Sequence, residues 1–432
     1  MDPLEQMVHL SKRAGFGEDL KTLSSWQTQG YDHAVSALFQ TPSALTADIA
    51  PVTSESKETR GTDFSKIREA WINRMTTTNQ SLIEKMTLFW HNHFATAEYK
   101  VNSPALMLHQ NNTLRKNALG SFRQMLLDMT ADPAMLIWLD NAQSTKNSPN
   151  ENYGRELMEL FTIGLTYTQA DVTAASQAMT GYQLNRKSGD VHFVPGRHND
   201  SIKTFFGHTG NLGPADIIDD LLVNPNCAPF VVTKILKWFV HPAPPADWVS
   251  KFAKVWVDND YHIGWLMRTI FLSDEFQSPA VVGSLVKSPA DYVVGLIRMT
   301  HAPIPVRQLD LVMTSGGMQL FNPPNVAGWS GGQSWLSSAT LLSRFNFAFG
   351  VAKRIGGQPL PGSETLGSSD GLSNSPLPTG LQVLSESQLF LPSATTSNAL
   401  SSFSIQQNYL SKANLLQHLR YLSFVSPEFQ MC

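Results

Sequence analysis

The chain contains 432 residues, of which 42% are hydrophobic and 16% are charged, and its formal net charge is −3. This length can bury a large core, and the slightly acidic charge argues against nucleic acid or an anionic membrane surface as a partner. No apolar run is long enough to span a membrane, and the first residues contain no export signal, so neither feature is expected. Cys227 and Cys432 allow at most one disulfide, which excludes a disulfide-stabilised scaffold and leaves their pairing open.

The first segment with a recognisable pattern is a short amphipathic turn at residues 9–17, with two glycines near its end. We expect it to be a helix that docks on the body with Lys12 and Arg13 in solvent. The alternative is that Arg13 contacts a phosphate or a carboxylate. Residues 47–63 are rich in Ser, Thr, Glu and Lys, which predicts a surface loop.

Residues 65–94 carry apolar side chains at helical spacing, and two histidines lie at the end of this stretch. On one helix the side chains of His91 and His93 point about 200° apart, so they cannot bind the same metal ion unless the helix ends between them. His93 falls on the apolar stripe, which predicts either a buried histidine bonded to a carboxylate or a catalytic or ligand role. We expect His91 to be half-exposed.

Helices are also expected at residues 109–129 and from Asp132-Pro133 to about residue 140. The segment with the clearest ends is 148–164. Ser148 and Glu151 form a capping box, Pro149 suits the first helical position, and Gly164 can adopt the left-handed conformation that stops a helix. We therefore predict a single helix over residues 148–164.

One stripe of this helix concentrates polar and ionisable side chains: Asn152, Arg155, Glu156 and Glu159. We predict that Arg155 keeps Glu156 ionised, while burial and the like-charged neighbour raise the pKa of Glu159, so that one carboxyl group acts as base and the other as acid. If His93 also reaches both glutamates, the three side chains are suitable ligands for one divalent metal ion such as zinc, manganese or iron. The alternative is an ordinary surface ion pair between Arg155 and Glu159.

Residues 168–181 predict a helix capped by Thr168 and Asp171, and residues 181–195 predict one β-hairpin. The next loop places His198, Asp200 and Lys203 within six residues, a combination that suits acid–base chemistry or the binding of an anionic group. The alternative is a hydrogen-bonded turn in which Asp200 acts as a cap.

Apolar helical patterns between residues 214 and 301 predict a multi-helix core to which we assign no chemistry. Residues 321–335 cannot form a helix, because two prolines and three glycines interrupt them. Asn325 and Trp329 in this loop suit a sugar ring, which stacks on an aromatic face and bonds through its hydroxyls. The alternative is a structural loop that packs its tryptophans into the body.

Together these patterns predict a mainly α protein, a large multi-helix single body with one small β-hairpin at about residues 181–195 and long irregular loops. We assign residues 1–355 to the helical body, as one unit or two intimate subdomains. Residues 356–402 are an insertion rich in Gly, Ser and Pro. Residues 403–432 are expected to form a C-terminal helix that returns to the body.

Several segments, spread over nearly the whole chain, together resemble a bacterial family known as domain of unknown function 1800 (DUF1800). They are His9-Leu-Ser-Lys-Arg-Ala-Gly-Phe-Gly17, Phe89-Trp-His-Asn-His-Phe94, Asn150-Glu-Asn-Tyr-Gly-Arg-Glu-Leu-Met-Glu-Leu-Phe-Thr-Ile-Gly164, Lys203-Thr-Phe-Phe-Gly207, Pro323-Pro-Asn-Val-Ala-Gly-Trp329 and Ser426-Pro-Glu-Phe-Gln430. The resemblance implies a mainly helical, often exported protein, whose gene frequently lies beside that of an exported protein similar to alkaline phosphatases and sulfatases. This chain departs from the pattern by carrying Asn199 where many relatives have Asp, and its first residues do not lead us to expect a leader.

Two functions are compatible with these patterns. The first is a hydrolase-like enzyme that acts on a glycan or a sulfated polymer, with Glu156, Glu159, His93 and Arg155 as catalytic residues and one divalent metal ion as a candidate cofactor. Its candidate substrate-binding residues are His91, His198, Asp200, Lys203, Asn325 and Trp329. The second is a non-catalytic protein that binds a glycan or assembles with the sulfatase-like companion. A histidine and a carboxylate within about 3 Å of each other at the floor of a pocket favour the enzyme.

Overall fold

The computed structural model describes residues 1–40, 60–186, 188–356 and 412–432, together with residues 358, 360, 361, 396, 398–400 and 402. As predicted, the protein is mainly α-helical, and the strands in this described part form two small antiparallel sheets. None of the described helices combines the length and the apolar content needed to cross a membrane. Cys227 and Cys432 are both buried free thiols.

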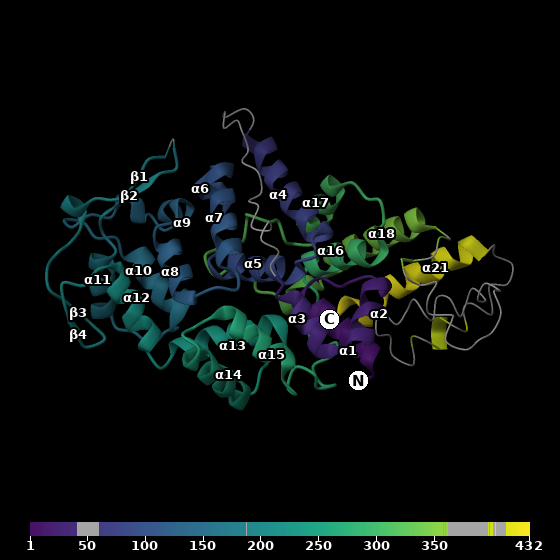
Figure 1. Ribbon diagram of the computed structural model, residues 1–432. Coiled ribbons are helices and arrows are strands. Elements are labelled where there is room, and N and C mark those ends of the chain that lie inside the picture. The colour runs from purple at the N-terminus through teal and green to yellow at the C-terminus, as the bar shows by residue number, and fades with distance from the viewer. Residues whose placement is uncertain are drawn as a thin grey trace.

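The helices in the first part of the chain are α1 (Pro3–Ala14), α2 (Leu20–Gln29), α3 (Tyr31–Leu38), α4 (Arg60–Thr77), α5 (Ser81–His93), α6 (Glu98–Val101), α7 (Pro104–Asn117), α8 (Phe122–Thr130) and α9 (Pro133–Trp138). The later helices are α10 (Glu151–Glu156), a π-helix (Leu157–Thr162), α11 (Gln169–Ala178), α12 (Pro214–Val223), α13 (Cys227–Phe239), α14 (Ala246–Asp258), α15 (Ile263–Leu272), α16 (Pro289–Thr300), α17 (Val306–Ser315), α18 (Ser338–Ile355) and α21 (Lys412–Val425). Figure 1 shows α8 to α12 at one end of an elongated body, with α1, α2, α18 and α21 at the other.

Side-chain caps explain why several helices begin where they do. Thr168 and Asp171 form the predicted capping box at α11, and Ser288 and Asp291 form another at α16. Asp132 accepts a backbone N–H in the first turn of α9, as the Asp-Pro pair predicted. Helix α21 confirms a helix near the C-terminus, whereas most of the predicted insertion at residues 356–402 lies outside the described residues. Of the loop predicted at residues 47–63, residues 47–59 also lie outside the described residues, and residues 60–63 belong to the first turn of α4 instead.

Segment 148–164 departs from the prediction of one regular helix. Helix α10 begins at Glu151 rather than directly after Ser148, because Asn150 is its N-cap and accepts the backbone N–H of Asn152. The second half of the segment widens into the π-helix, and Gly164 follows with a φ of +70°, as predicted. The carbonyl groups at the end of a helix have no partner within it, so they can accept hydrogen bonds from other elements.

The predicted hairpin is confirmed, and a second one was missed. Strand β1 (Tyr182–Leu184) pairs with β2 (Val191–Phe193), with Gln183 opposite His192; Lys187 in its turn lies outside the described residues. Strand β3 (Lys203–Phe205) pairs with β4 (His208–Gly210) through a two-residue turn at Phe206 and Gly207. Both turn residues have positive φ values, of 45° and 85°, as a type I′ turn requires. This turn was not predicted, because a phenylalanine rarely adopts a positive φ.

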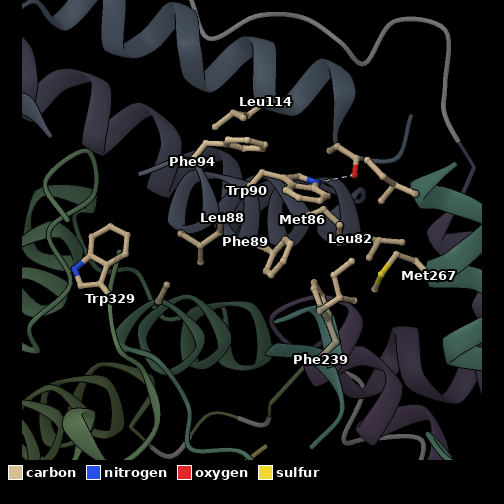
Figure 2. Packing of buried hydrophobic residues seen from close by; sticks show 14 of the residues in the cluster. Leu82, Met86, Leu88, Phe89, Trp90, Phe94, Leu114, Phe239, Met267 and Trp329 are labelled. Carbon is tan, nitrogen blue, oxygen red and sulfur yellow. Dashed lines mark hydrogen bonds between the residues drawn. The ribbon is translucent and has the colours of Figure 1, made fainter. Parts of the chain in front are cut away.

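One contiguous hydrophobic cluster extends from Met7 to Phe429, so the ends of the chain share one core. Helix α5 packs on α1, α4 and α7, and Figure 2 shows its apolar side chains at the centre of this cluster. Trp90 of α5 is fully buried and donates a hydrogen bond of 3.1 Å to the carbonyl of Ala118. In the same view Phe239 approaches from α13 and Trp329 from the loop before α18. The position of α5 places its C-terminal residues beside both of these elements.

Candidate functional site

A pocket of about 730 Å³ lies where α1, α5, α13, α16 and the loop before α18 meet. This volume is typical of a small-molecule or cofactor site. The cationic and acidic side chains that line it come from four helices: Arg13, Lys85, Lys234, Lys237 and Asp291. The pocket therefore gathers residues that lie more than two hundred positions apart in the sequence.

The pocket is electropositive, although the chain as a whole is acidic. Among its described lining residues, four cationic side chains face a single carboxylate side chain, that of Asp291. This carboxylate is already occupied, because it forms an ion pair with Lys85 and accepts hydrogen bonds from the backbone and hydroxyl of Ser288. The negative charge at Cys432 acts on Arg13 and so offsets part of the charge of a second pocket cation. The remaining positive charge favours an anionic ligand.

Arg13 is 1% exposed and lacks a complete set of partners. Its Nη2 donates to the carbonyl of Val281 at 2.6 Å and to Oγ of Ser284 at 3.0 Å. Its Nε and Nη1 atoms are buried without a hydrogen-bond partner within the described chain. Burial lowers the pKa of Arg13 from its ordinary value, but a guanidinium stays protonated in proteins. Unpaired buried donors are rare, so this cation is suited to receive acceptor atoms from a ligand.

Lys234 is held at the pocket by the π-helix. Its Nζ donates to the carbonyl of Leu160 at 2.6 Å and lies 4.8 Å from the centre of the Phe230 ring. Burial lowers the pKa of Lys234 to about 8. The amine is therefore mostly charged at pH 7 and loses its charge as the pH rises past 8.

The π-helix also orients His93. Nε2 of His93 donates to the carbonyl of Phe161 at 3.0 Å, and Nδ1 is buried with no partner in the described residues. Burial first, and then the charge of Lys234, hold the pKa of His93 well below its usual value, so the imidazole is neutral at pH 7. The sequence predicted a carboxylate as the partner of a buried His93, whereas the partner is a backbone carbonyl.

The loop before α18 supplies an aromatic wall. Trp329 lines the pocket, and its backbone N–H donates to Oδ1 of Asn92 at 2.7 Å. Gly328 has a φ of +80° and packs directly on Asn92, with no room for a Cβ atom. Trp335 and Trp238 also line the pocket, so three indole rings border its cations. This mixture of ring faces and charged donors suits a polar ligand with a flat apolar side.

The family described as "Protein of unknown function (DUF1800)" matches residues 9–431. The chain belongs to the DUF1800 family. No curated protein and no solved structure matches it.

In this DUF1800 protein three of the six segments that carry the resemblance line the pocket. Arg13 comes from the segment at 9–17, His93 from the segment at 89–94 and Trp329 from the segment at 323–329. The segment at 150–164 contributes the carbonyls that hold His93 and Lys234. The segments at 203–207 and 426–430 do not line the pocket.

The polar stripe predicted on segment 148–164 does not line the pocket. Arg155 donates to Glu151 and to Gln169 in a largely exposed ion pair, and Tyr167 donates to Glu159. Glu156 is half-buried, and burial, then the charge of Glu159, raises its pKa. Among the predicted catalytic residues only His93 lines the pocket.

The predicted metal ligands also do not lie together. Within the described ranges no three His, Cys, Asp or Glu side chains lie close enough together to hold a metal ion. His93 is directed to the Phe161 carbonyl, whereas Glu159 bonds to Tyr167. The two histidines of α5 diverge, as the helical geometry predicted.

The prediction of a half-exposed His91 is wrong, because His91 is 1% exposed. Its Nε2 accepts the backbone N–H of Phe321 at 3.1 Å, and its ring contacts Trp71. Burial lowers the pKa of His91 to about 3, which keeps the ring neutral. His91 therefore supports the loop that starts at Phe321, and it does not line the pocket.

The other predicted binding residues, apart from Trp329, also lie outside the pocket. His198 donates to the carbonyl of Thr180, and Lys203 is buried and donates to the carbonyl of Ser201. Asp200 is exposed, and it is Asn199 rather than Asp200 that caps this turn.

Asn325 accepts the backbone N–H of Ala327 and shapes the turn that leads to Trp329. Its side chain is exposed and does not line the pocket. The contribution of Asn325 is therefore to the loop conformation.

Most of the pocket cations were not predicted as site residues. Lys12 and Arg13 were expected in solvent, but both are buried. Lys85 lies on the predicted helix that carries the two histidines, and Lys234 lies on a helix assigned to the core. The signal that pointed to them was a lysine within a mostly apolar helix. A buried lysine needs a hydrogen-bond or ion-pair partner, so a lysine at such a position indicates a candidate site.

Proposed function

We propose that this protein binds an anionic glycan, carrying sulfate or carboxylate groups, in the pocket between α1, α5, α13 and α16. The observation that carries the proposal is the set of four cations that line the pocket, which outnumber the negative charges of Asp291 and Cys432. Charge-assisted hydrogen bonds from lysine and arginine to such groups are about twice as strong as neutral ones. Arg13 and Lys234 are the groups we expect to contact the anion.

The aromatic wall supports a sugar as the carrier of the charge. Trp329, Trp335 and Trp238 line the same pocket, and an indole face packs well on the C–H face of a sugar ring. Binding therefore uses positive charge for the acidic group and ring stacking for the sugar.

Catalysis by Glu156, Glu159, Arg155 and His93 stays a prediction. A hydrolase needs an acid and a base beside the scissile bond. In the pocket, Asp291 is committed to Lys85 and Ser288, and neither Glu156 nor Glu159 lines it. These contacts favour binding over hydrolysis as the function of the pocket.

Removing the charge of Lys234 tests the proposal. In Lys234→Gln an amide N–H can still reach the Leu160 carbonyl, but the cation is lost. We expect the parent protein to bind glucose 6-sulfate and not glucose in isothermal titration calorimetry, and the variant to bind it about tenfold more weakly, as loss of a charged hydrogen bond implies. Lys116→Gln, on the exposed face of α7, is the matched control and should bind like the parent. Equal affinity for both sugars would refute the proposal.

The pH dependence of binding follows from the pKa of Lys234, which is about 8. The amine is charged below this value and neutral above it, so affinity for the sulfated sugar should fall as the pH rises from 7 to 9.5, towards the affinity of Lys234→Gln. Lys12 also has a pKa of about 8, but it does not line the pocket. Lys234→Arg keeps its charge throughout this range and should remove most of the fall. A parent affinity that is constant over the range would contradict the role of Lys234.

A further inference from the structure

A second hollow of about 510 Å³ adjoins the pocket. It lies between α13 and α14 and is bordered by the segment 242–244 that connects them. Lys237 and Pro242 line both hollows, so the two are neighbours with a shared wall. Lys237 is exposed at this junction.

The second hollow differs from the pocket in its chemistry. Apart from Lys237 its lining is uncharged, and consists of proline, alanine and valine side chains with two hydroxyl groups. The hydroxyls of Thr233 and Ser250 already donate to carbonyls within their own helices, of Pro229 and Ala246. Each keeps free acceptor capacity only, so the surface suits an uncharged ring with hydroxyl donors and an apolar face.

We infer that the ligand is an oligomer that occupies both hollows, with an acidic unit in the pocket and an uncharged sugar unit in the second hollow. This inference rests on the proposed function and specifies its ligand class. The link between the two units passes Lys237, the cation that lines both hollows, and we expect its ammonium to contact the acidic unit. A single sugar leaves the second hollow empty, so a second unit adds contact area without a new cost of bringing two molecules together.

The test compares glucose 6-sulfate with maltotriose that carries one 6-sulfate on a terminal residue. We expect the trisaccharide to bind about tenfold more tightly in calorimetry, and its unsulfated form to bind far more weakly. Ser250→Trp fills the second hollow from the exposed face of α14, and should reduce the affinity of the trisaccharide to that of the monosaccharide while leaving the monosaccharide affinity unchanged.

Thr173→Trp is the matched control, because Thr173 is an exposed helix hydroxyl with the same bond to the carbonyl four residues earlier. It lies on α11, outside both hollows, and should bind both sugars like the parent. Equal affinities of the two sulfated sugars for the parent would overturn the inference and leave the proposed function standing. If the trisaccharide bound more tightly than the monosaccharide, but its affinity were unchanged in Ser250→Trp, the second sugar unit would not occupy the second hollow. Binding of neither sugar would reject the proposed function itself, and the inference with it.

Discussion

Replacing Glu84 with glutamine is expected to lower the free energy of unfolding by about 3–5 kcal/mol, the range for breaking one side of a buried ion pair. Glu84 is 1% exposed on α5 and bridges three other side chains. Its carboxylate accepts from Arg115 at 2.7 and 3.1 Å, from Arg74 at 2.7 Å and from the indole N–H of Trp71 at 2.8 Å. Glutamine can replace some of these bonds, but it leaves Arg115 as a buried cation without its counter-charge.

Urea unfolding monitored by circular dichroism measures this effect. The matched control is Glu151→Gln, which removes the partner of Arg155 in an ion pair whose side chains are 43% and 37% exposed. That change should cost less than about 0.5 kcal/mol, because water replaces the lost contact. If both variants lost the same free energy of unfolding, the burial of the Glu84 ion pair would contribute nothing to stability, and the prediction would be wrong.

Gly328→Ala should destabilise the loop before α18 and weaken ligand binding by at least about tenfold. An alanine at the φ of +80° costs about 1–2 kcal/mol. In addition, the new Cβ would overlap Asn92, and overpacking of this kind adds about 1–3 kcal/mol. Relief of the overlap moves the loop away from α5 and breaks the bond between the Trp329 N–H and Asn92. Trp329 then leaves the pocket wall.

Gly207→Ala is the control that separates the free-energy cost of a positive φ from the cost of the steric overlap. Gly207 has a φ of +85°, but no atom lies within 4 Å of a Cβ at this position. Only the backbone cost of about 1–2 kcal/mol should appear there, with unchanged affinity for the sulfated sugar. Thermal unfolding and calorimetry on both variants make the comparison. A Gly328→Ala protein that bound the sugar like the parent would show that Trp329 contributes nothing to the site.

Features that depend on neighbouring residues were predictable. The Thr168 capping box, the hairpin at residues 181–195 and the divergence of His91 and His93 all follow from interactions between residues a few positions apart. Gly164 was correctly placed at the end of its segment for the same reason. The π-helix was not predictable, because the helical periods differ little over six residues and outside partners of its carbonyls help to stabilise it.

Local patterns in this chain were thus enough to specify a mainly helical DUF1800 protein and some of its helix ends, since caps and apolar periodicity act over a few residues. The electropositive pocket belongs to the tertiary structure alone. Arg13 and Lys234 look like ordinary helix cations in the sequence, and they become pocket residues only because the fold buries Arg13 on α1 and holds half-buried Lys234 of α13 against the π-helix. Burial is decided by distant segments, and burial is what turns a solvated charge into a group that needs a partner.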